Sequence, residues 1–517
     1  MTAGRSRCAL AAVTLALAAA GCSDDAEPRD EAGAGGSLVV AEATAPGSLD
    51  PALVATSVAR RAAWLAYTPP LTYRRAEGED GTDLVPALSE EAPETSDDGR
   101  SYSFRLRRGV RYSNGMMLRA SDFERAVARS LRLSPSGLVL WRNVVGARAY
   151  ARADGDSIDV PGIAVNDRSG RVRIELESPD RLFPYALATL AAAPVPRGTP
   201  LRDLTDDPPP GIGPYRVAQV RRGGDVVLER RREWRLPGIP AGNPREIVTR
   251  TIADGAARVD AVRDGRADLV EGESPLRMLP DVRSSGDGRY AEYPTLRTLY
   301  VAIDASRAPF RDGDVRRALS YSLDARVLAQ LHDGFMQPAC NVLPPQVAGY
   351  RELDPCPFGA REGDADLVEA SRLVEDAGAR GAAVRVAGGA DARGRRLTRY
   401  LVATLRKIGL AARLVPRADA QVAFAAVSPA IPHPAGYLAG LDDPVLAARV
   451  ELLEQEADAQ DAEQDWAALD EEAVTRAYVA PYGVATAGVL ASRRLDMQGC
   501  ARFHPVVGMD YSSVCLR

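Results

Sequence analysis

Histidine is scarce in this sequence, and its scarcity narrows the chemistry that the chain can perform. Only three histidines occur among 517 residues, at His332, His433 and His504. No two of them stand in the H-E-x-x-H spacing of a zinc protease, and the sequence contains neither a G-x-S-x-G elbow nor a P-loop. Carboxylates are numerous, but no motif pairs them for acid–base work. The sequence therefore argues against an enzyme and predicts neither a cofactor nor a metal site.

Basic tracts and long apolar runs are missing as well. The formal net charge is −5 and is spread without a basic tract, so nucleic acid is not an expected partner. Beyond the first 21 residues, no apolar run approaches the roughly 20 residues that cross a bilayer. The length instead suggests two or three globular domains.

The N-terminus has the pattern of an exported protein. Arg5 and Arg7 precede a short apolar run over residues 8–20, and the small residues Ala19, Ala20 and Gly21 lead directly to a cysteine. This is typical of a secretory signal over residues 1–21. Cys22 after small residues also resembles a bacterial lipobox, in which the cysteine is acylated and becomes the mature N-terminus. The alternative is an ordinary signal peptide with an incidental cysteine.

The segment that follows predicts a tether rather than a domain. Residues 22–36 are acidic and rich in Gly and Ala, without apolar periodicity, so we expect a flexible linker from the lipidated cysteine to the folded body. The sequence thus predicts an extracytoplasmic protein held at the outer face of the cell membrane by its N-terminal lipid.

Four of the six cysteines remain after export and lipidation. They are Cys340, Cys356, Cys500 and Cys515. An even count in an exported protein predicts two disulfides, for which three connectivities are possible. Pairing of sequence neighbours would close two short loops and stabilise the fold by about 3 kcal/mol for each loop. Metal binding is the rival, but no pair has the spacing of a zinc site.

Periodicity predicts an α/β fold. Residues 102–106 alternate between apolar and polar side chains, as in a half-buried strand, and Ser121 with Glu124 forms a capping box at the start of a helix. Further predicted elements are strands over 37–41, 216–220, 226–229, 384–386 and 410–415, and helices over 367–377 and 397–408. The strand–helix–strand order over 384–415 indicates a partly parallel sheet.

An ordered set of segments resembles one family of binding proteins. The segments are Ser48–Pro51, Leu84–Ser89, Asp98–Gly115, Ala120–Phe123, Gly211–Tyr215, Pro309–Asp324 and Leu405–Leu410. Together they resemble the extracytoplasmic solute-binding proteins of ABC importers, bacterial family 5, whose members bind oligopeptides, dipeptides or nickel. The resemblance runs in order from about residue 37 to the C-terminus.

The resemblance implies a two-lobed clamp of the periplasmic-binding-protein kind, with a small inserted domain. Lobe one is expected from residues 37–60, 185–293 and 481–517, the inserted domain from 61–184, and lobe two from 294–480. A peptide-like or other small organic ligand would be held between the lobes of a monomer and delivered to an ABC permease and its ATPase. The alternatives are a sensing or scaffolding lipoprotein with the same fold, and a secreted hydrolase.

The resemblance also indicates candidate ligand-binding residues. Ser48 and Leu49 belong to a loop that faces the cleft in relatives. Trp141 lies in a stretch that resembles the inserted domain, where stacking on ligand and packing in a core are both open.

One candidate segment departs from the family pattern. In peptide-binding relatives an Asp in the corresponding loop pairs with the peptide ammonium, but residues 422–437 contain no acid. Because burial of an unpaired ammonium costs several kcal/mol, we do not expect a free-amine peptide unless Asp442, Asp443 or another acid takes over. The segment offers Ser428 and His433 instead. His433 would donate a hydrogen bond to the ligand or bind a metal complex, or else it is a surface histidine between prolines.

Overall fold

The structure is a computed structural model, and it describes residues 35–155, 159–221, 224–272, 283, 289–359, 364–439, 441, 444–456 and 459–517. All of them belong to one structural unit. The predicted signal peptide, the predicted lipidation site Cys22 and most of the tether lie outside the described residues. Among the described helices, none has the length and apolar character that crossing a membrane requires.

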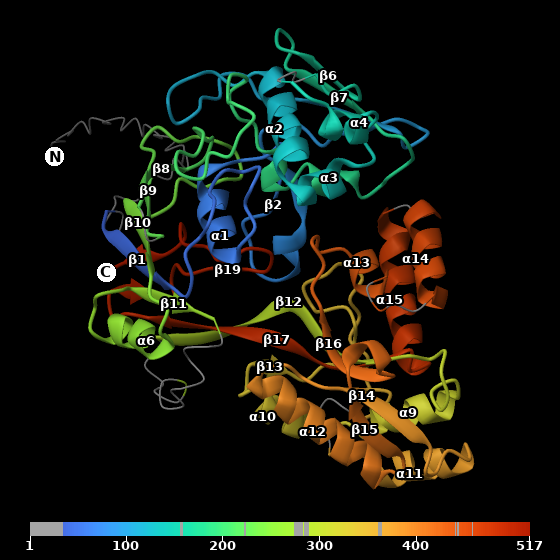
Figure 1. Ribbon diagram of the computed structural model, residues 1–517. Helices are drawn as coiled ribbons and strands as arrows, with labels where there is room; N and C mark the ends of the chain where they lie inside the picture. The colour runs from blue at the N-terminus through green and yellow to red at the C-terminus, as the bar shows by residue number, and fades with distance from the viewer. Residues whose placement is uncertain are drawn as a thin grey trace, which may run out of the picture. The chain divides into compact units, whose positions relative to one another are not determined.

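A mixed β-sheet runs through the described part of the chain (Figure 1). In sheet order its strands are β15 (Ala411–Val415), β14 (Ala383–Ala387), β16 (Val422–Val427), β12 (Tyr290–Ile303), β17 (Val479–Ala491), β11 (Leu269–Glu271), β1 (Ser37–Glu42), β10 (Glu246–Thr251), β9 (Val226–Arg230) and β8 (Tyr215–Val220), with β13 (Met336–Gln337) paired to β17. Strand β1 is parallel to β10 and β11, and β14 is parallel to β15 and β16. The other pairs are antiparallel, which confirms the predicted α/β class with a partly parallel sheet.

One end of the sheet forms lobe one. The apolar side chains Leu38 and Val40 of β1 are fully buried, and they pack with α1 (Ser57–Ala66) in one hydrophobic core. Helix α6 (Gly255–Arg263) covers a second cluster around Val259. The chain returns to this end at its C-terminus, with the short strands β18 (Leu495–Asp496), β19 (Phe503–His504), β20 (Gly508–Met509) and β21 (Cys515–Leu516).

The other end of the sheet forms lobe two, with helices on both faces. Successive residues of β12 point to opposite faces, as a pleated strand requires: Leu299 and Val301 join one core and Tyr300 joins the other. The first core lies under α9 (Gly313–Tyr321), α10 (Ala325–Leu331), α11 (Leu367–Asp376) and α12 (Ala392–Lys407). The second lies under α13 (Pro434–Ala439), α14 (Pro444–Glu456) and α15 (Ala459–Thr475).

The predicted β-α-β unit of lobe two is present as β14, α12 and β15. The helix begins at Ala392 rather than at the predicted Leu397. The cause is an N-cap: Asp391 Oδ1 accepts a hydrogen bond from the Gly394 backbone N–H at 2.7 Å, which satisfies a donor of the first turn. This turn carries polar side chains, so apolar periodicity did not mark it.

Two long strands join the lobes. Strand β12 has 14 residues and β17 has 13. Tyr482 of β17 packs in the core of lobe two, and Val489 of the same strand packs in the core of lobe one. The expected boundaries after residues 293 and 480 therefore fall inside these strands. Two cores that share a pair of connecting strands confirm the predicted two-lobed architecture.

The inserted domain has a core of its own. An antiparallel sheet of β4 (Glu94–Thr95), β5 (Ser101–Arg105), β7 (Arg171–Glu175) and β6 (Ile163–Asn166) packs with α2 (Ala120–Leu133), α3 (Pro135–Trp141) and α4 (Ala147–Arg152). Flanking short elements are β2 (Leu71–Tyr73), η1 (Glu79–Thr82), β3 (Leu84–Pro86), α5 (Phe183–Ala186) and η2 (Leu190–Ala192). Its apolar cluster extends to Ile239, past the expected limit at residue 184.

The predicted capping box of α2 is wrong in its residues. The helix begins at Ala120, and the Asp122 carboxylate accepts a hydrogen bond from the Arg119 backbone N–H at 2.9 Å. Ser121 instead donates through its hydroxyl to Asp167 at 2.9 Å. Glu124 is buried and accepts from the Val160 backbone N–H at 3.3 Å. Asp122 makes the capping contact, rather than Glu124, because a capping carboxylate must lie close enough to the N-cap residue to accept a hydrogen bond from its backbone N–H.

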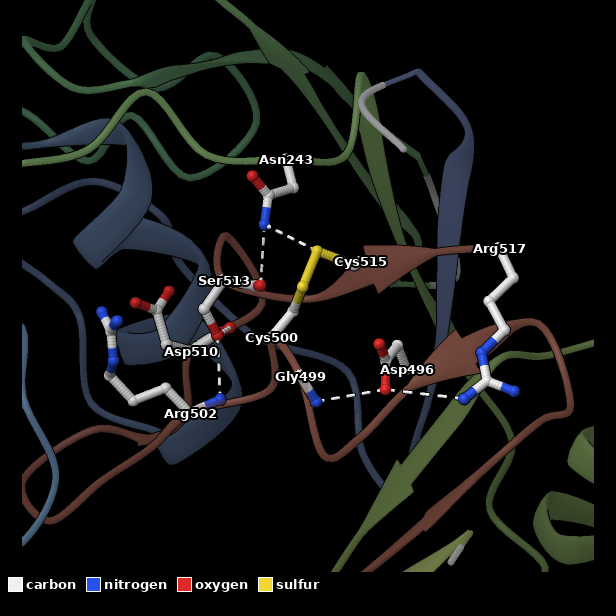
Figure 2. Close-up of a disulfide and its surroundings, with 9 residues drawn as sticks. All are labelled: Asn243, Asp496, Gly499, Cys500, Arg502, Asp510, Ser513, Cys515 and Arg517. Carbon is white, nitrogen blue, oxygen red and sulfur yellow. Dashed lines mark hydrogen bonds and ion pairs between the residues drawn. A yellow bond between two sulfur atoms is a disulfide. The ribbon is translucent and has the colours of Figure 1, made fainter. Parts of the chain in front are cut away.

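Both predicted disulfides are present, between sequence neighbours. Cys340 pairs with Cys356 in lobe two, and Cys500 pairs with Cys515 in lobe one. Figure 2 shows the second bridge beside Asn243, whose side-chain amide donates to the Ser513 carbonyl at 2.8 Å. This bridge ties the C-terminal strand β21 to the segment that follows β18.

Candidate functional site

A pocket of about 520 Å³ opens in lobe two beside the two connecting strands. Its lining residues come from β12, β16, β17, the start of α12 and the segments next to them: Arg297, Leu299, Tyr300, His332, Asp391, Arg393, Gly394, Leu397, Arg417, Phe424, Ala425, Ala426, Tyr482 and Ala485. The volume lies within the range of small-molecule sites in proteins, roughly 300–1,000 Å³.

A second hollow, of about 490 Å³, lies on the face of β8, β9, β10 and β1 in lobe one. Its charges are balanced, because Arg221 and Arg250 line it together with Glu229 and Glu246. It lies on strands that do not connect the lobes. The lobe-two pocket is therefore the better candidate, since it borders both connecting strands and has an excess of one charge.

That excess is positive. Arg297, Arg393 and Arg417 line the pocket against one carboxylate, Asp391. Arg393 lies 3.7 Å from Asp333, an ion pair that offsets part of its charge. Within the described residues, no carboxylate comes within ion-pair distance of Arg297 or Arg417. Arg297 lies at an irregularity of β12, where the register against β17 shifts between Pro294 and Thr298.

The wall of the pocket also holds a buried histidine–tyrosine pair. His332 Nε2 lies 3.2 Å from the Tyr482 hydroxyl, and His332 is only 5% exposed. Burial lowers the pKa of His332 to about 4, and the nearby charges of Arg393 and Arg297 act in the same direction. The imidazole is therefore neutral near pH 7, and the positive charge of the pocket comes from its arginines.

The segment predicted from residues 422–437 borders this pocket. Its first half forms β16, from which Phe424, Ala425 and Ala426 line the pocket. Ser428 follows the strand and is exposed. The described residues 428–439 contain no acid, and Asp442 and Asp443 lie outside the described residues.

His433 lies between two aromatic rings from different parts of the chain. Its ring is 5.7 Å from that of Tyr185, next to the inserted domain, and 5.5 Å from that of Trp466 on α15, both edge-on. Its Nδ1 accepts a hydrogen bond from the Ala435 backbone N–H at 3.3 Å. Burial lowers the pKa of His433 to about 4. His433 is thus a half-buried, neutral packing residue near pH 7, rather than a solvated surface histidine.

Acidification should destabilise the protein through His433. Its pKa is about 4 in the folded chain and about 6.5 when unfolded, so between these values the unfolded chain binds a proton that the folded chain does not. The free energy of unfolding should therefore fall by about 2 kcal/mol at pH 5 through this residue. Urea unfolding at pH 7 and pH 5 measures the loss, and His433→Gln should show a loss smaller by that amount. Equal losses in both proteins would contradict the assignment.

The other predicted site residues lie away from the pocket. Leu49 is fully buried in the core of lobe one, and the Ser48 hydroxyl accepts a hydrogen bond from the Asp50 backbone N–H at 3.1 Å. Trp141 is fully buried in the core of the inserted domain, where its Nε1–H donates to the Ser130 hydroxyl at 3.3 Å. In this structure Leu49 and Trp141 present no surface to a ligand. The surroundings of Trp141 are those of a core residue, which was the alternative to stacking on ligand.

Sequence reasoning missed the charged residues of the pocket. Arg297, Arg393 and Arg417 come from three separate segments, and nothing in their local sequence distinguishes them among 65 cationic residues. One signal was available: Asp391 and Gly394 have the spacing of an N-cap and its donor, which marks the start of a helix directly beside Arg393.

Comparisons with known proteins agree on a family. The model of the bacterial extracellular solute-binding proteins, family 5 (middle), matches residues 83–438. The oligopeptide-binding protein OppA of Bacillus subtilis (strain 168) is 24% identical over 318 residues, which cover 60% of this chain and 56% of that protein. The probable deoxycholate-binding periplasmic protein YgiS of Escherichia coli (strain K12) is 27% identical over 312 residues, covering 59% and 56%. In each case the match spans little more than half of the curated relative.

Solved structures share the fold over nearly the whole chain. The clavulanic acid biosynthesis oligopeptide binding protein 2 superposes with a TM-score of 0.79 at 22% identity, covering 93% of this chain and 96% of that one. The periplasmic murein tripeptide binding protein MppA, in an unliganded open form, gives a TM-score of 0.78 at 18% identity, covering 94% and 99%. At these identities the likeness shows the architecture alone.

Proposed function

Because this chain belongs to the bacterial extracellular solute-binding proteins of family 5, we propose that it is the substrate-binding component of an ABC-type importer. It captures a peptide-like or other small organic solute between its two lobes and delivers it to a membrane permease. The family consists of binding proteins. The observation that carries the proposal is the lobe-two pocket, which borders both strands that join the lobes.

The position of the pocket suits a clamp. Leu299 and Tyr300 of β12 and Tyr482 and Ala485 of β17 line it, so a bound solute touches the strands on which the lobes would move. A ligand shifts a conformational equilibrium only by its difference in affinity for the two states. A solute seated in lobe two favours closure when lobe one adds contacts to it.

The names of the relatives leave the solute class open. The matched proteins are described as binding oligopeptides, deoxycholate, heme and glutathione. These ligands differ in size, charge and shape, so membership of the family does not select among them.

The proposal is tested by the solute that the protein retains. Protein expressed in its native host is purified, denatured and extracted, and mass spectrometry identifies small molecules present at up to one per chain. The identified compound should raise the unfolding temperature of stripped protein, since a ligand at 100 times its Kd adds about 2.7 kcal/mol to stability. The proposal would be contradicted if the protein retained no compound, if no compound raised its unfolding temperature, and if a strain lacking the gene took up solutes as the wild type does.

The lipid anchor is a further part of the proposal, supported by the small residues before Cys22. Acyl chains hold a protein at a membrane with about 0.8 kcal/mol for each buried CH₂, and two signals give stable anchoring. Cys22→Ala should therefore release the protein into the medium or periplasm, as immunoblots of fractionated cells would show. Ser23→Ala serves as the control and should stay with the membrane. If the Cys22 variant also stays there, the lipobox interpretation is wrong.

A further inference from the structure

We propose that the lobe-two pocket takes a small organic anion with an apolar or aromatic body and no ammonium group. The inference rests on the proposed function, because it names the chemical class of the solute that the protein captures.

The charge of the pocket is the first argument. Arg297 and Arg417 reach the same cavity from β12 and from η3 (Arg417–Asp419), and neither has a carboxylate within ion-pair distance among the described residues. Arg393 adds a third guanidinium, partly offset by Asp333. Guanidinium groups bind carboxylate, sulfonate or phosphate oxygens through short, charge-assisted hydrogen bonds. An anionic group in the cavity would therefore find in Arg297 and Arg417 two guanidinium groups that no carboxylate of the described residues pairs with.

The single acid of the pocket does not reverse this preference. Asp391 Oδ1 accepts a hydrogen bond from the Gly394 backbone N–H at 2.7 Å and caps α12. That hydrogen bond lowers the pKa of Asp391, and the charge of Arg393 contributes to the shift. An incoming ammonium group would have to share this carboxylate with a helix cap while it faced the arginines.

The uncharged residues that line the cavity are the basis for the proposed apolar or aromatic part of the ligand. Phe424 and Ala425 are half-buried and Ala426 is exposed, so these residues of β16 supply apolar surface to the cavity, whereas Leu299 and Tyr482 lie almost fully buried behind it. His332 is neutral near pH 7 and is held by its contact with Tyr482. A solute with charge at one end and an apolar body fits this division, whereas a small inorganic anion would leave the walls without contacts.

The test compares two probes that differ by one sulfonate group, which carries the negative charge. The aromatic anion 8-anilinonaphthalene-1-sulfonate and the neutral N-phenyl-1-naphthylamine have the same aromatic body, and both fluoresce on binding. Wild-type protein should bind one molecule of the sulfonate about tenfold more tightly than the neutral probe.

Matched variants tie that difference to the pocket. Arg297→Gln/Arg417→Gln should weaken sulfonate binding by about tenfold or more and leave the neutral probe unchanged. Arg399→Gln/Arg413→Gln removes the same charge from two exposed positions outside the pocket and should bind both probes as wild type does. All four positions are polar surface or rim sites, and thermal melting verifies that the variants are folded.

A competition experiment compares two peptide-like compounds, one anionic and one with an ammonium group, as displacers of the sulfonate probe. Acetyl-Ala-Phe carries only a carboxylate, and Ala-Phe amide carries only an ammonium group. We expect the first to displace the sulfonate probe and the second to leave it bound. Equal affinity for both probes, no saturable binding of the sulfonate, or displacement by the amine overturns the inference. A retained solute that is cationic would overturn it too while leaving the proposed function intact.

Discussion

Replacing Arg129 by alanine is expected to lower the free energy of unfolding by about 3–5 kcal/mol. The Arg129 side chain is 1% exposed and pairs with Asp50, whose side chain is completely buried. The same guanidinium donates to the Pro200 and Arg202 carbonyls. Removing it leaves the Asp50 carboxylate buried without its cation, and an unpaired buried charge is costly. Urea unfolding of wild-type and variant protein measures the difference.

Two further variants distinguish the cost of an unpaired buried charge from the cost of lost side-chain volume. Arg129→Met with Asp50→Asn removes both charges and should cost less than Arg129→Ala alone, because no unpaired charge remains. Arg171→Ala breaks an exposed ion pair with Glu94 and should change stability by about 0.5 kcal/mol or less. A double variant at least as unstable as Arg129→Ala would show that packing, not charge, sets the cost.

The ion pair between Arg129 and Asp50 also positions the loop that contains Ser48 and Leu49. The resemblance to relatives implied that this loop faces the ligand cleft. In the structure this loop joins lobe one to α2 of the inserted domain through Asp50 and Arg129, and Leu49 turns into the core beside it. The partner of Asp50 lies 79 residues further along the chain, where no local pattern marks it.

Local patterns predicted local structure well. The alternation of Tyr102 and Phe104 identified β5, because a strand with one buried face leaves a period of two in its sequence. Export and an even count of cysteines predicted two disulfides but left their connectivity open, and the structure pairs Cys340 with Cys356 and Cys500 with Cys515. The caps of α2 and α12 were not predicted. At α2 the Asp122 carboxylate, rather than the predicted Ser121 and Glu124, makes the capping contact, and at α12 the polar first turn lacks the apolar periodicity by which the helix was identified.

The pocket could not be predicted from the sequence, for a different reason. Arg297, Arg393 and Arg417 converge only after β12, β14, β15 and β16 pair in register, and the sequence separates them by 20 residues or more. The departure in residues 422–437 was nevertheless informative. The absence of an acid there and the excess of arginine in the pocket beside it both disfavour an ammonium group, although the two observations come from different segments.

Trp141→Ala is expected to lower the free energy of unfolding by about 3–5 kcal/mol. The ring is fully buried and makes edge-to-face contacts with Phe123 at 6.3 Å and Phe183 at 6.1 Å. Its Nε1–H bond to Ser130 satisfies the one polar atom of the side chain. Truncation would leave a cavity among groups that come from α2, α3 and α5, so the surrounding structure can collapse into it only in part. Thermal or urea unfolding measures the loss.

The same variant distinguishes a core residue from one that stacks on the ligand. Val139, on the same helix, is 63% exposed, and Val139→Ala should change stability by about 0.5 kcal/mol or less. If Trp141 serves only the core, the folded fraction of Trp141→Ala will bind solute with the affinity of wild type, because the lobe-two pocket contains no residue of α3. A tenfold weaker affinity combined with unchanged stability would instead assign Trp141 to ligand stacking, and would require the inserted domain to reach the solute in the closed state.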